Sequence, residues 1–198
     1  MDITIDTRAI TLETPRLLLR PWREDDLDDF YAYASVDGVG QMAGWMPHKS
    51  RDESREIIRK FIGQGDVFAL EHKSDRRVIG SLGVHTTRWE RLPEPENPYA
   101  AKRTKELGYV LSRDYWGQGL MPEAVRCVQK YLFDALHADI LFVSHYDFNT
   151  QSRRVIEKCG FVYLTEGDHY ARQLGKTLHL LHYCLPRETY YANNSGNF

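Results

Sequence analysis

The segment DYWGQGLMPEA, residues 114–124, has the residue types of an anion-binding turn. Gly117 and Gly119 flank a single residue, and glycine permits positive φ angles and the close approach of a ligand to the backbone. A strand-like run, Glu106–Ser112, precedes the glycines, and a helix-like run follows them. The first N–H groups of a helix lack partners within the helix and carry a partial positive charge. The junction therefore predicts a cradle for a phosphate or a pyrophosphate.

The two glycines alone leave the type of anion open, and an ordinary turn is an alternative. A dinucleotide-binding fingerprint needs a third glycine at the position that Pro122 occupies. A P-loop needs a Gly-Lys pair followed by Ser or Thr, which this segment lacks. A mononucleotide-binding protein that uses the same loop is one further possibility.

The composition is that of an ordinary globular chain. Its 198 residues are 42% hydrophobic, which is enough for one domain with a sizeable core. The formal net charge is −2, and no basic cluster is large enough for a nucleic-acid footprint. No apolar run approaches the roughly 20 residues of a membrane helix, and the N-terminal sequence lacks the order of a signal peptide. We therefore expect a cytoplasmic protein with no nucleic-acid and no membrane partner.

The cysteines and histidines give no sign of a metal site. Cys127, Cys159 and Cys184 are far apart, which indicates free thiols in a reducing compartment. There is no CxxC or HxxxH spacing, and the eight histidines are scattered, so we expect no metal. Cys127 and Cys159 fall in helical patterns, where a small buried apolar role is expected rather than a nucleophile.

Strand and helix patterns alternate along the second half of the chain, which predicts a sheet with helices on its faces. Ser50 with Glu53 three residues later predicts a capping box. The proline-rich segment 86–105 is either a functional loop or a tolerated surface insertion, and residues 190–198 predict a frayed tail. The predicted strands are 16–22, 66–72, 78–85, 106–112, 139–145, 161–164 and 177–185, and the predicted helices are 24–35, 50–61, 122–136 and 149–159.

Three segments resemble the GNAT N-acetyltransferase superfamily, and more narrowly its RimJ/RimL-type branch, which includes ribosomal-protein N-terminal acetyltransferases. They are TPRLLLRPWREDDLDDFYAY (14–33), ELGYVLSRDYWGQGLMPEAV (106–125) and NTQSRRVIEKCGF (149–161). The resemblance implies the acyl-CoA N-acyltransferase fold, with its core over about residues 14–185 of a single domain. This is an α+β, three-layer fold whose mixed, mostly antiparallel sheet of about seven strands is splayed in the middle, with helices on both faces.

The same resemblance implies where acetyl-CoA binds, with no metal. The pyrophosphate would lie on the amides of the glycine loop. Pantetheine would pair with the free edge of the splayed strand as an extra strand would. The implied residues are Tyr109, Val110 and Leu111 on the strand, Trp116, Gly117, Gln118, Gly119, Leu120 and Met121 in the loop, and Asn149 and Ser152 beyond it. Met121 stands where the family has a small residue, and Asn149 is also suited to cap a helix.

Acetyl transfer to an amine needs a base, and a donor for the departing thiolate. Glu106, at the start of the splayed strand, is the first candidate for the base, and an exposed edge carboxylate is the alternative. His85 and His145 each end a strand and are either second candidates or structural. The tyrosine that many relatives use as the acid is Ile156 here, so the branch resemblance points to Ser152, which alternatively only binds CoA or caps the helix.

The sequence therefore predicts an acetyl-CoA-dependent N-acetyltransferase that works by direct transfer in a ternary complex. The acceptor implied by the resemblance is a protein N-terminal amine, and a small-molecule amine is the alternative. A non-catalytic acyl-CoA-binding or sensing module is the alternative from another class. We expect a monomer or a homodimer.

Overall fold

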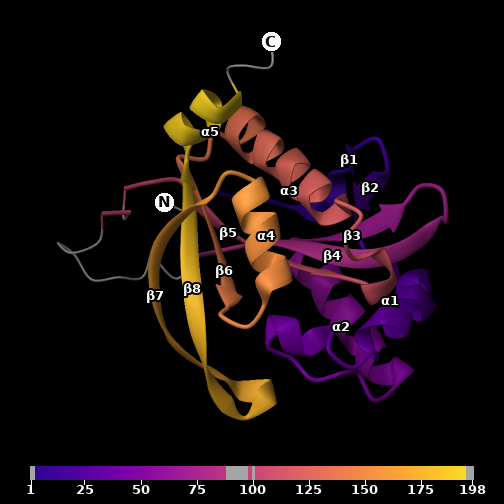
Figure 1. The fold of residues 1–198 in the computed structure, drawn as a ribbon. Helices are drawn as coiled ribbons and strands as arrows, with labels where there is room; N and C mark the ends of the chain where they lie inside the picture. Colours follow the sequence, from indigo (N-terminus) through magenta and orange to yellow (C-terminus); the bar gives the residue numbers. More distant parts are fainter. Residues whose placement is uncertain (1–2, 88–97, 100, 195–198) are drawn as a thin grey trace.

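A computed structural model describes residues 3–87, 98–99 and 101–194, so most of the proline-rich segment lies outside the described residues. These residues form one eight-stranded sheet with helices on both of its faces (Figure 1). The strand order across the sheet is β1-β2-β3-β4-β5-β6-β8-β7. The strands are β1 (Leu12–Glu13), β2 (Leu17–Arg20), β3 (Val67–His72), β4 (Arg77–His85), β5 (Thr104–Leu111), β6 (Ile140–Tyr146), β7 (Val162–Ala171) and β8 (Lys176–Pro186).

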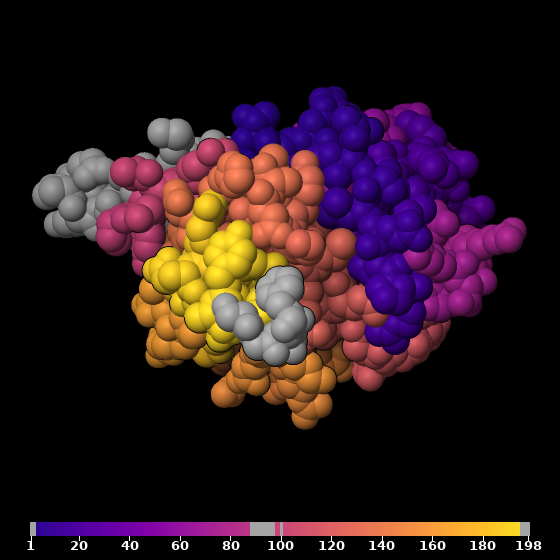
Figure 2. Space-filling view, turned by 90° about the horizontal axis from the view of Figure 1, so that it is seen from above, coloured from indigo at the N-terminus to yellow at the C-terminus, as the bar shows by residue number. Residues whose placement is uncertain are grey.

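The helices divide into two layers. Helices α1 (Leu27–Ala34) and α2 (Arg51–Gln64) cover one face of the sheet, and α3 (Leu120–Lys130) and α4 (Thr150–Lys158) cover the other (Figure 1). The last helix, α5 (Arg187–Asn194), follows β8 directly. Seen from above, α5 lies in yellow against the rest of the molecule (Figure 2).

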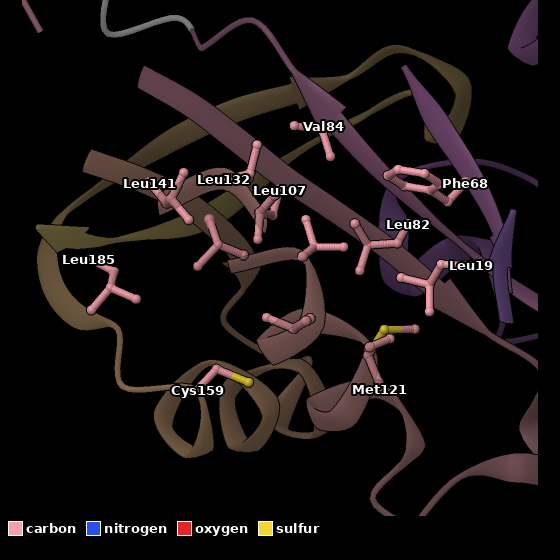
Figure 3. Packing of buried hydrophobic residues seen from close by; sticks show 14 of the residues in the cluster. Leu19, Phe68, Leu82, Val84, Leu107, Met121, Leu132, Leu141, Cys159 and Leu185 are labelled. Atoms are coloured by element: carbon pink, nitrogen blue, oxygen red, sulfur yellow. The ribbon is translucent and has the colours of Figure 1, made fainter. Parts of the chain in front are cut away.

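The larger core lies between the sheet and the layer of α3 and α4. Leu132 and Leu107 are at most 2% exposed, and Figure 3 shows them packed with leucines of several strands. The apolar residues of α3 recur at helical spacing, so one face of the helix enters the core. Truncating one such buried leucine to alanine typically costs about 2–5 kcal/mol.

In the described part of the chain, all strand pairs are antiparallel except one. β5 and β6 run parallel, and their paired residues extend only from Thr104 with Ile140 to Leu107 with Val143. The predicted mixed, mostly antiparallel sheet and its covering helices are therefore confirmed, with eight strands in place of about seven. The additional pairing comes from the two-residue strand β1, which is too short for a sequence pattern to show.

Several predicted ends differ from the structure, and the largest difference is in β7, which was predicted over residues 161–164 and extends over Val162–Ala171. Residues 190–194 of the predicted tail belong to α5, which continues to Asn194, and residues 195–198 lie outside the described residues. Tyr190 stacks on Phe133 with ring centroids 4.5 Å apart, and this contact anchors the helix. The helix predicted to run to residue 136 is α-helical only to Lys130 and ends in a π-helical turn.

The predicted capping box of α2 forms by half. The Ser50 hydroxyl accepts a hydrogen bond from the Glu53 N–H at 3.2 Å, as predicted. The Glu53 carboxylate accepts from the Lys49 N–H at 2.7 Å instead of from Ser50. The Glu53 carboxylate therefore accepts from the N–H of the residue before the N-cap, whereas in the motif it accepts from the N-cap N–H.

Candidate active site

The sheet opens between β5 and β6. Beyond Leu107, the residues of β5 pair only with β4, as far as Leu111 with Gly80. Beyond Val143, the residues of β6 pair only with β8, as far as Tyr146 with Leu180. The two strands therefore diverge, and among the described residues one edge of β5 has no strand partner over residues 108–111.

This opening holds a cavity of about 460 Å³. Ten of the eleven residues predicted to bind the cofactor line it, and Gln118 is the exception. The Gln118 carbonyl accepts a hydrogen bond from Arg16 at 2.9 Å, and its side chain donates to the Asp114 carbonyl. The ten residues are Tyr109, Val110, Leu111, Trp116, Gly117, Gly119, Leu120, Met121, Asn149 and Ser152. The structure thus brings together residues that are up to 43 positions apart in the chain.

The glycine loop has the backbone that its sequence predicts. Gly117 and Gly119 both have φ of +76°, a conformation that residues with a Cβ rarely adopt. Gly119 is the N-cap of α3, and no side chain of the described residues caps that helix end. The N–H groups of Leu120 and Met121 are therefore the unpaired donors of the first turn. Together with the helix dipole they suit a pyrophosphate.

The long side chain of Met121 does not obstruct the loop. Met121 is 4% exposed, and Figure 3 shows it within the core beside Leu19 and Leu82. The residue therefore contributes its amide to the loop while its side chain packs underneath. The family's small residue at this position is not required here for that reason.

Arg16 fixes the loop to the start of β2. It forms an ion pair with Glu123 at 2.6 Å and also donates to the Gln118 carbonyl at 2.9 Å. The Thr14 hydroxyl donates to the same glutamate at 2.5 Å. Burial would raise the pKa of Glu123, but these hydrogen bonds outweigh it and hold the pKa below its ordinary value. Thr14 and Arg16 thus hold the glycine loop and the first turn of α3 in place.

Asn149 is the N-cap of α4, as predicted. Its Oδ1 accepts from the Ser152 N–H at 3.0 Å, and its Nδ2 donates to the Met42 carbonyl at 3.0 Å. The second bond ties α4 to the 3-10 turn Gly40–Ala43, whose residues Met42 and Ala43 also line the cavity. The cap therefore also joins the two sides of the cavity.

The hydroxyl of Ser152 is paired with a tyrosine from the splayed strand. Tyr109 Oη lies 3.0 Å from Ser152 Oγ and 3.4 Å from the Ser152 carbonyl oxygen. Burial raises the pKa of Tyr109, so its phenol is protonated at neutral pH. When Tyr109 donates to Ser152 Oγ, the serine hydrogen is free to point elsewhere in the cavity.

Two cations of α4 line the cavity. Arg154 and Lys158 recur at helical spacing with Gln151 on the cavity side of the helix. Neither forms an ion pair within the described part of the chain, and no carboxylate is among the residues that line the cavity there. An anionic ligand therefore finds two cations available to it.

Glu106 lies at the point where the strands separate. Its Oε1 accepts from the Ser144 hydroxyl at 3.1 Å, and its Oε2 accepts from the Thr87 hydroxyl at 3.3 Å. Ser144 lines the cavity, and its Oγ lies 2.6 Å from Nδ1 of the buried His182. Glu106 itself is not among the lining residues, so it reaches the cavity wall through Ser144.

The two candidate histidines differ. His145 lines the cavity but is 4% exposed, and its Nδ1–H donates to the Tyr146 carbonyl at 2.8 Å. Its Nε2 accepts from the Tyr183 hydroxyl at 3.2 Å, and burial lowers its pKa. Both nitrogens are thus used structurally. His85 lies opposite Glu106 across the β4–β5 pair and is bonded to Asp66.

Sequence reasoning missed several residues of the site. Arg154 and Lys158 could have been found, because helical spacing after the Asn149 cap places them on the same face as Gln151. The Ser144–His182 pair arises between strands that are 38 positions apart, and no local pattern shows it.

Across residues 3–87, 98–99 and 101–194, no helix is long and apolar enough to span a membrane. The same ranges contain no group of three or more His, Cys, Asp or Glu side chains placed to hold a metal ion.

Comparison with known proteins agrees with this geometry. A family model described as an acetyltransferase (GNAT) domain matches residues 16–162. The chain is 26% identical over 155 residues to the uncharacterized N-acetyltransferase YoaA of Bacillus subtilis (strain 168), and the match covers 76% of this chain and 81% of the relative.

Solved structures show the same fold. RimJ of Mycobacterium smegmatis, in complex with CoA-disulfide, has a TM-score of 0.73 at 18% identity and covers 98% of both chains. A ribosomal-protein-S5-alanine acetyltransferase from Vibrio fischeri has a TM-score of 0.67 at 18% identity, covering 90% of this chain and 97% of its own. The family model matches well over half of the chain, so the chain belongs to the GNAT family of acetyltransferases and is an acyltransferase.

Proposed function

We propose that this chain transfers the acetyl group of acetyl-CoA to the primary amine at the N-terminus of a protein, by direct transfer in a ternary complex. The observation that carries the proposal is the cavity of about 460 Å³ in the splayed sheet, bounded by the glycine loop on one side and by α4 on the other. This cavity combines unpaired backbone donors with cations, which are the groups that an acyl-CoA needs.

Each part of acetyl-CoA is assigned to a part of the cavity, starting from the pyrophosphate. The pyrophosphate lies on the amides of Leu120 and Met121, with Arg154 and Lys158 available for phosphate charge. Pantetheine follows the free edge of β5 at Tyr109. The Leu111 carbonyl is already bound by the Trp116 indole at 2.9 Å, so the edge open to pantetheine ends before it.

The thioester then lies at the inner end of the splay, near Ser144 and Glu106. The amine nitrogen attacks the carbonyl carbon, and a C–N bond forms while the carbonyl oxygen takes negative charge. A backbone N–H near Val110 stabilises that charge. Glu106 takes a proton from the nitrogen, the C–S bond breaks, and Ser152 donates a proton to the thiolate. Positioning the two substrates together is worth up to about 7–11 kcal/mol of the barrier.

The acceptor class rests on the structural relatives. The protein from Vibrio fischeri is described as acting on an alanine of ribosomal protein S5, and it shares this fold. The described residues that line the cavity include no carboxylate. A site for a polycationic small molecule would be expected to have carboxylates that attract it. Both observations support a protein N-terminus over a polyamine.

The test uses the Glu106→Gln variant with acetyl-CoA and a short peptide that has a free N-terminal alanine. A glutamine keeps the size and the hydrogen bond from Ser144 but cannot take a proton, so turnover should fall by about 10²-fold or more. Acetyl-CoA affinity should not change. The exposed Glu56→Gln on α2 is the matched control and should keep full turnover.

The other outcomes identify the alternatives. Turnover of small amines but not of the peptide would show a small-molecule acetyltransferase. Acetyl-CoA binding without turnover of any amine would show a sensing module. Unchanged turnover in Glu106→Gln would remove Glu106 from the mechanism.

A further inference from the structure

His85 shares a sheet face with Glu106. The two residues are directly opposite in the antiparallel β4–β5 pair, and such residues have Cβ atoms about 4.5–5.5 Å apart on the same face. Leu107 packs in the core under α3, and Val110 packs against the cluster of α1 and α2. Because side chains alternate along a strand, Glu106 and His85 lie on the α1 and α2 side.

The ring of His85 lies beside two glycines on this face of the sheet, and neither has a side chain that would compete for the same space. A Cβ at Gly83 would be 2.1 Å from His85 Nε2, and a Cβ at Gly108 would be 3.6 Å from His85 Cδ2. Gly108 lines the cavity. His85 is not itself among the lining residues, but its ring lies beside Gly108 in the cavity wall, and Gly83 has no side chain in the space that the ring occupies.

Asp66 sets the tautomer of this ring. Its Oδ2 lies 2.8 Å from His85 Nδ1, so the nitrogen donates and Nε2 is left as an acceptor. The hydrogen bond from His85 lowers the pKa of Asp66 below its ordinary value against the effect of burial, so the carboxylate is ionised at neutral pH. Its second oxygen, Oδ1, is buried and has no hydrogen-bond partner among the described residues.

We propose that His85, oriented by Asp66, is a second catalytic group at the amine site and removes the first proton from the incoming ammonium. The proposal rests on the proposed function, because it divides the proton transfers of that reaction between two groups. An amine arrives at neutral pH largely as the ammonium and cannot attack until it loses one proton. Glu106 then serves the second proton transfer.

The protons balance in this scheme. One N–H bond of the ammonium breaks and an Nε2–H bond forms, and the charge of the imidazolium is balanced by Asp66. The His85 side chain is 45% exposed, so it returns this proton to solvent. The neutral amine attacks, its second proton passes to Glu106, and Ser152 donates a proton to the thiolate. Glu106 then gives its proton to solvent, and solvent returns one to Ser152, so both groups are restored. The net products are the amide, CoA thiol and one solvent proton.

Charged side chains from more than one element lie around His85. Asp66 and Glu106 are the carboxylates beside it, from the turn before β3 and from β5. Lys105 is the opposing charge, since it contributes to lowering the pKa of Asp66. His182 is connected through Ser144 to Glu106 rather than to His85.

The experiment measures kcat/KM between pH 6 and 9.5 for the parent chain, His85→Gln and Asp66→Asn, with acetyl-CoA and the alanine peptide. We expect His85→Gln to lose about 100-fold at pH 7. The loss should shrink above the α-amine pKa of about 8, where the peptide is already neutral. Asp66→Asn should show a smaller loss with the same pH dependence, because the ring loses its preferred tautomer. A loss independent of pH, or no loss, would overturn the proposal.

His72→Gln is the matched control. His72 also lies beside an aspartate, with Nδ1 3.0 Å from Asp75, at the opposite end of the β3–β4 pair. It should keep the parent pH profile. Gly83→Ala, whose Cβ displaces the imidazole, should reproduce the His85→Gln profile without removing a titrating group.

A second readout needs no acceptor. If the parent chain does not acetylate the peptide, the proposed acceptor is wrong, and the His85 assignment is decided by NMR of the imidazole nitrogens. A ring that is protonated at Nδ1 and unprotonated at Nε2 at pH 8, and that loses this preference in Asp66→Asn, supports the dyad. Protonation at Nε2 would overturn it.

Discussion

The pair of hydroxyls from Tyr109 and Ser152 gives a prediction in which structure and chemistry separate cleanly. Ser152→Ala removes the hydrogen bond at 3.0 Å and leaves Tyr109 Oη with only the Ser152 carbonyl at 3.4 Å. Tyr109→Phe removes the same bond from the other side. The double variant removes both partners at once.

The magnitudes follow from the burial of each partner. Tyr109 is half-buried and lines the cavity, and Ser152→Ala leaves its hydroxyl with only the contact at 3.4 Å, so we expect a loss of about 0.5–1.5 kcal/mol in the free energy of unfolding. Ser152 is half-buried and lines the cavity, where water can replace the lost bond, so Tyr109→Phe should cost about 0.5–1.5 kcal/mol. The double variant should be about 1 kcal/mol less destabilised than the sum.

The assay is urea unfolding of the four proteins, together with kcat on the alanine peptide at saturating acetyl-CoA. A loss of 1 kcal/mol corresponds to a fall in Tm of about 2–4 °C in a chain of this size. Ser152→Ala should also lower kcat by about 10–100-fold with little change in the KM for acetyl-CoA. Thr150→Ala removes an exposed hydroxyl from the same helix and should change neither quantity.

Two results would refute the reasoning. Additive losses in the double variant would show that Tyr109 and Ser152 are not bonded to each other. A coupled loss of stability with an unchanged kcat would keep the bond but remove Ser152 as the proton donor.

Two further predictions concern the binding of phosphate and the pH dependence of stability. Arg154→Met and Lys158→Met should each weaken acetyl-CoA binding about 10-fold by calorimetry, and the effect should shrink at high salt, where phosphate charge is screened; an unchanged affinity would place the phosphates elsewhere. Glu123 has a folded pKa below its ordinary value of 4.5, so its contribution to stability is present above that pH and is lost as the pH falls through the folded pKa. Glu123→Gln should therefore lower the urea midpoint at pH 7, and the difference from the parent should close in acid; a difference that persists at pH 2 would contradict the assignment.

The elements of the fold were predictable wherever a local pattern specifies them. The glycines at 117 and 119 predict positive φ, and both have it. Asn149 predicts a helix cap, and its Oδ1 makes that bond. These features depend on residues within one turn of each other. The splay between β5 and β6 was implied by the resemblance to a family rather than by any pattern in the strands.

The polar groups around the amine site could not be predicted, because their contacts are set by register. Ser144 meets Glu106 and His182 through three different strands. His85 lies beside Asp66 because the hairpin of β3 and β4 brings the end of β4 next to the start of β3, 19 positions earlier in the chain. Met121 shows the converse: the family has a small residue at this position, and only the packing shows that the long side chain lies in the core.

The central claim is that the splay of β5 and β6 is an acetyl-CoA site. Calorimetric titration of the full chain with acetyl-CoA, with ATP and NAD as controls, tests it most directly. The account predicts micromolar binding of acetyl-CoA at one site per chain and no comparable binding of ATP or NAD. Absence of acetyl-CoA binding, or equal binding of ATP, would contradict it.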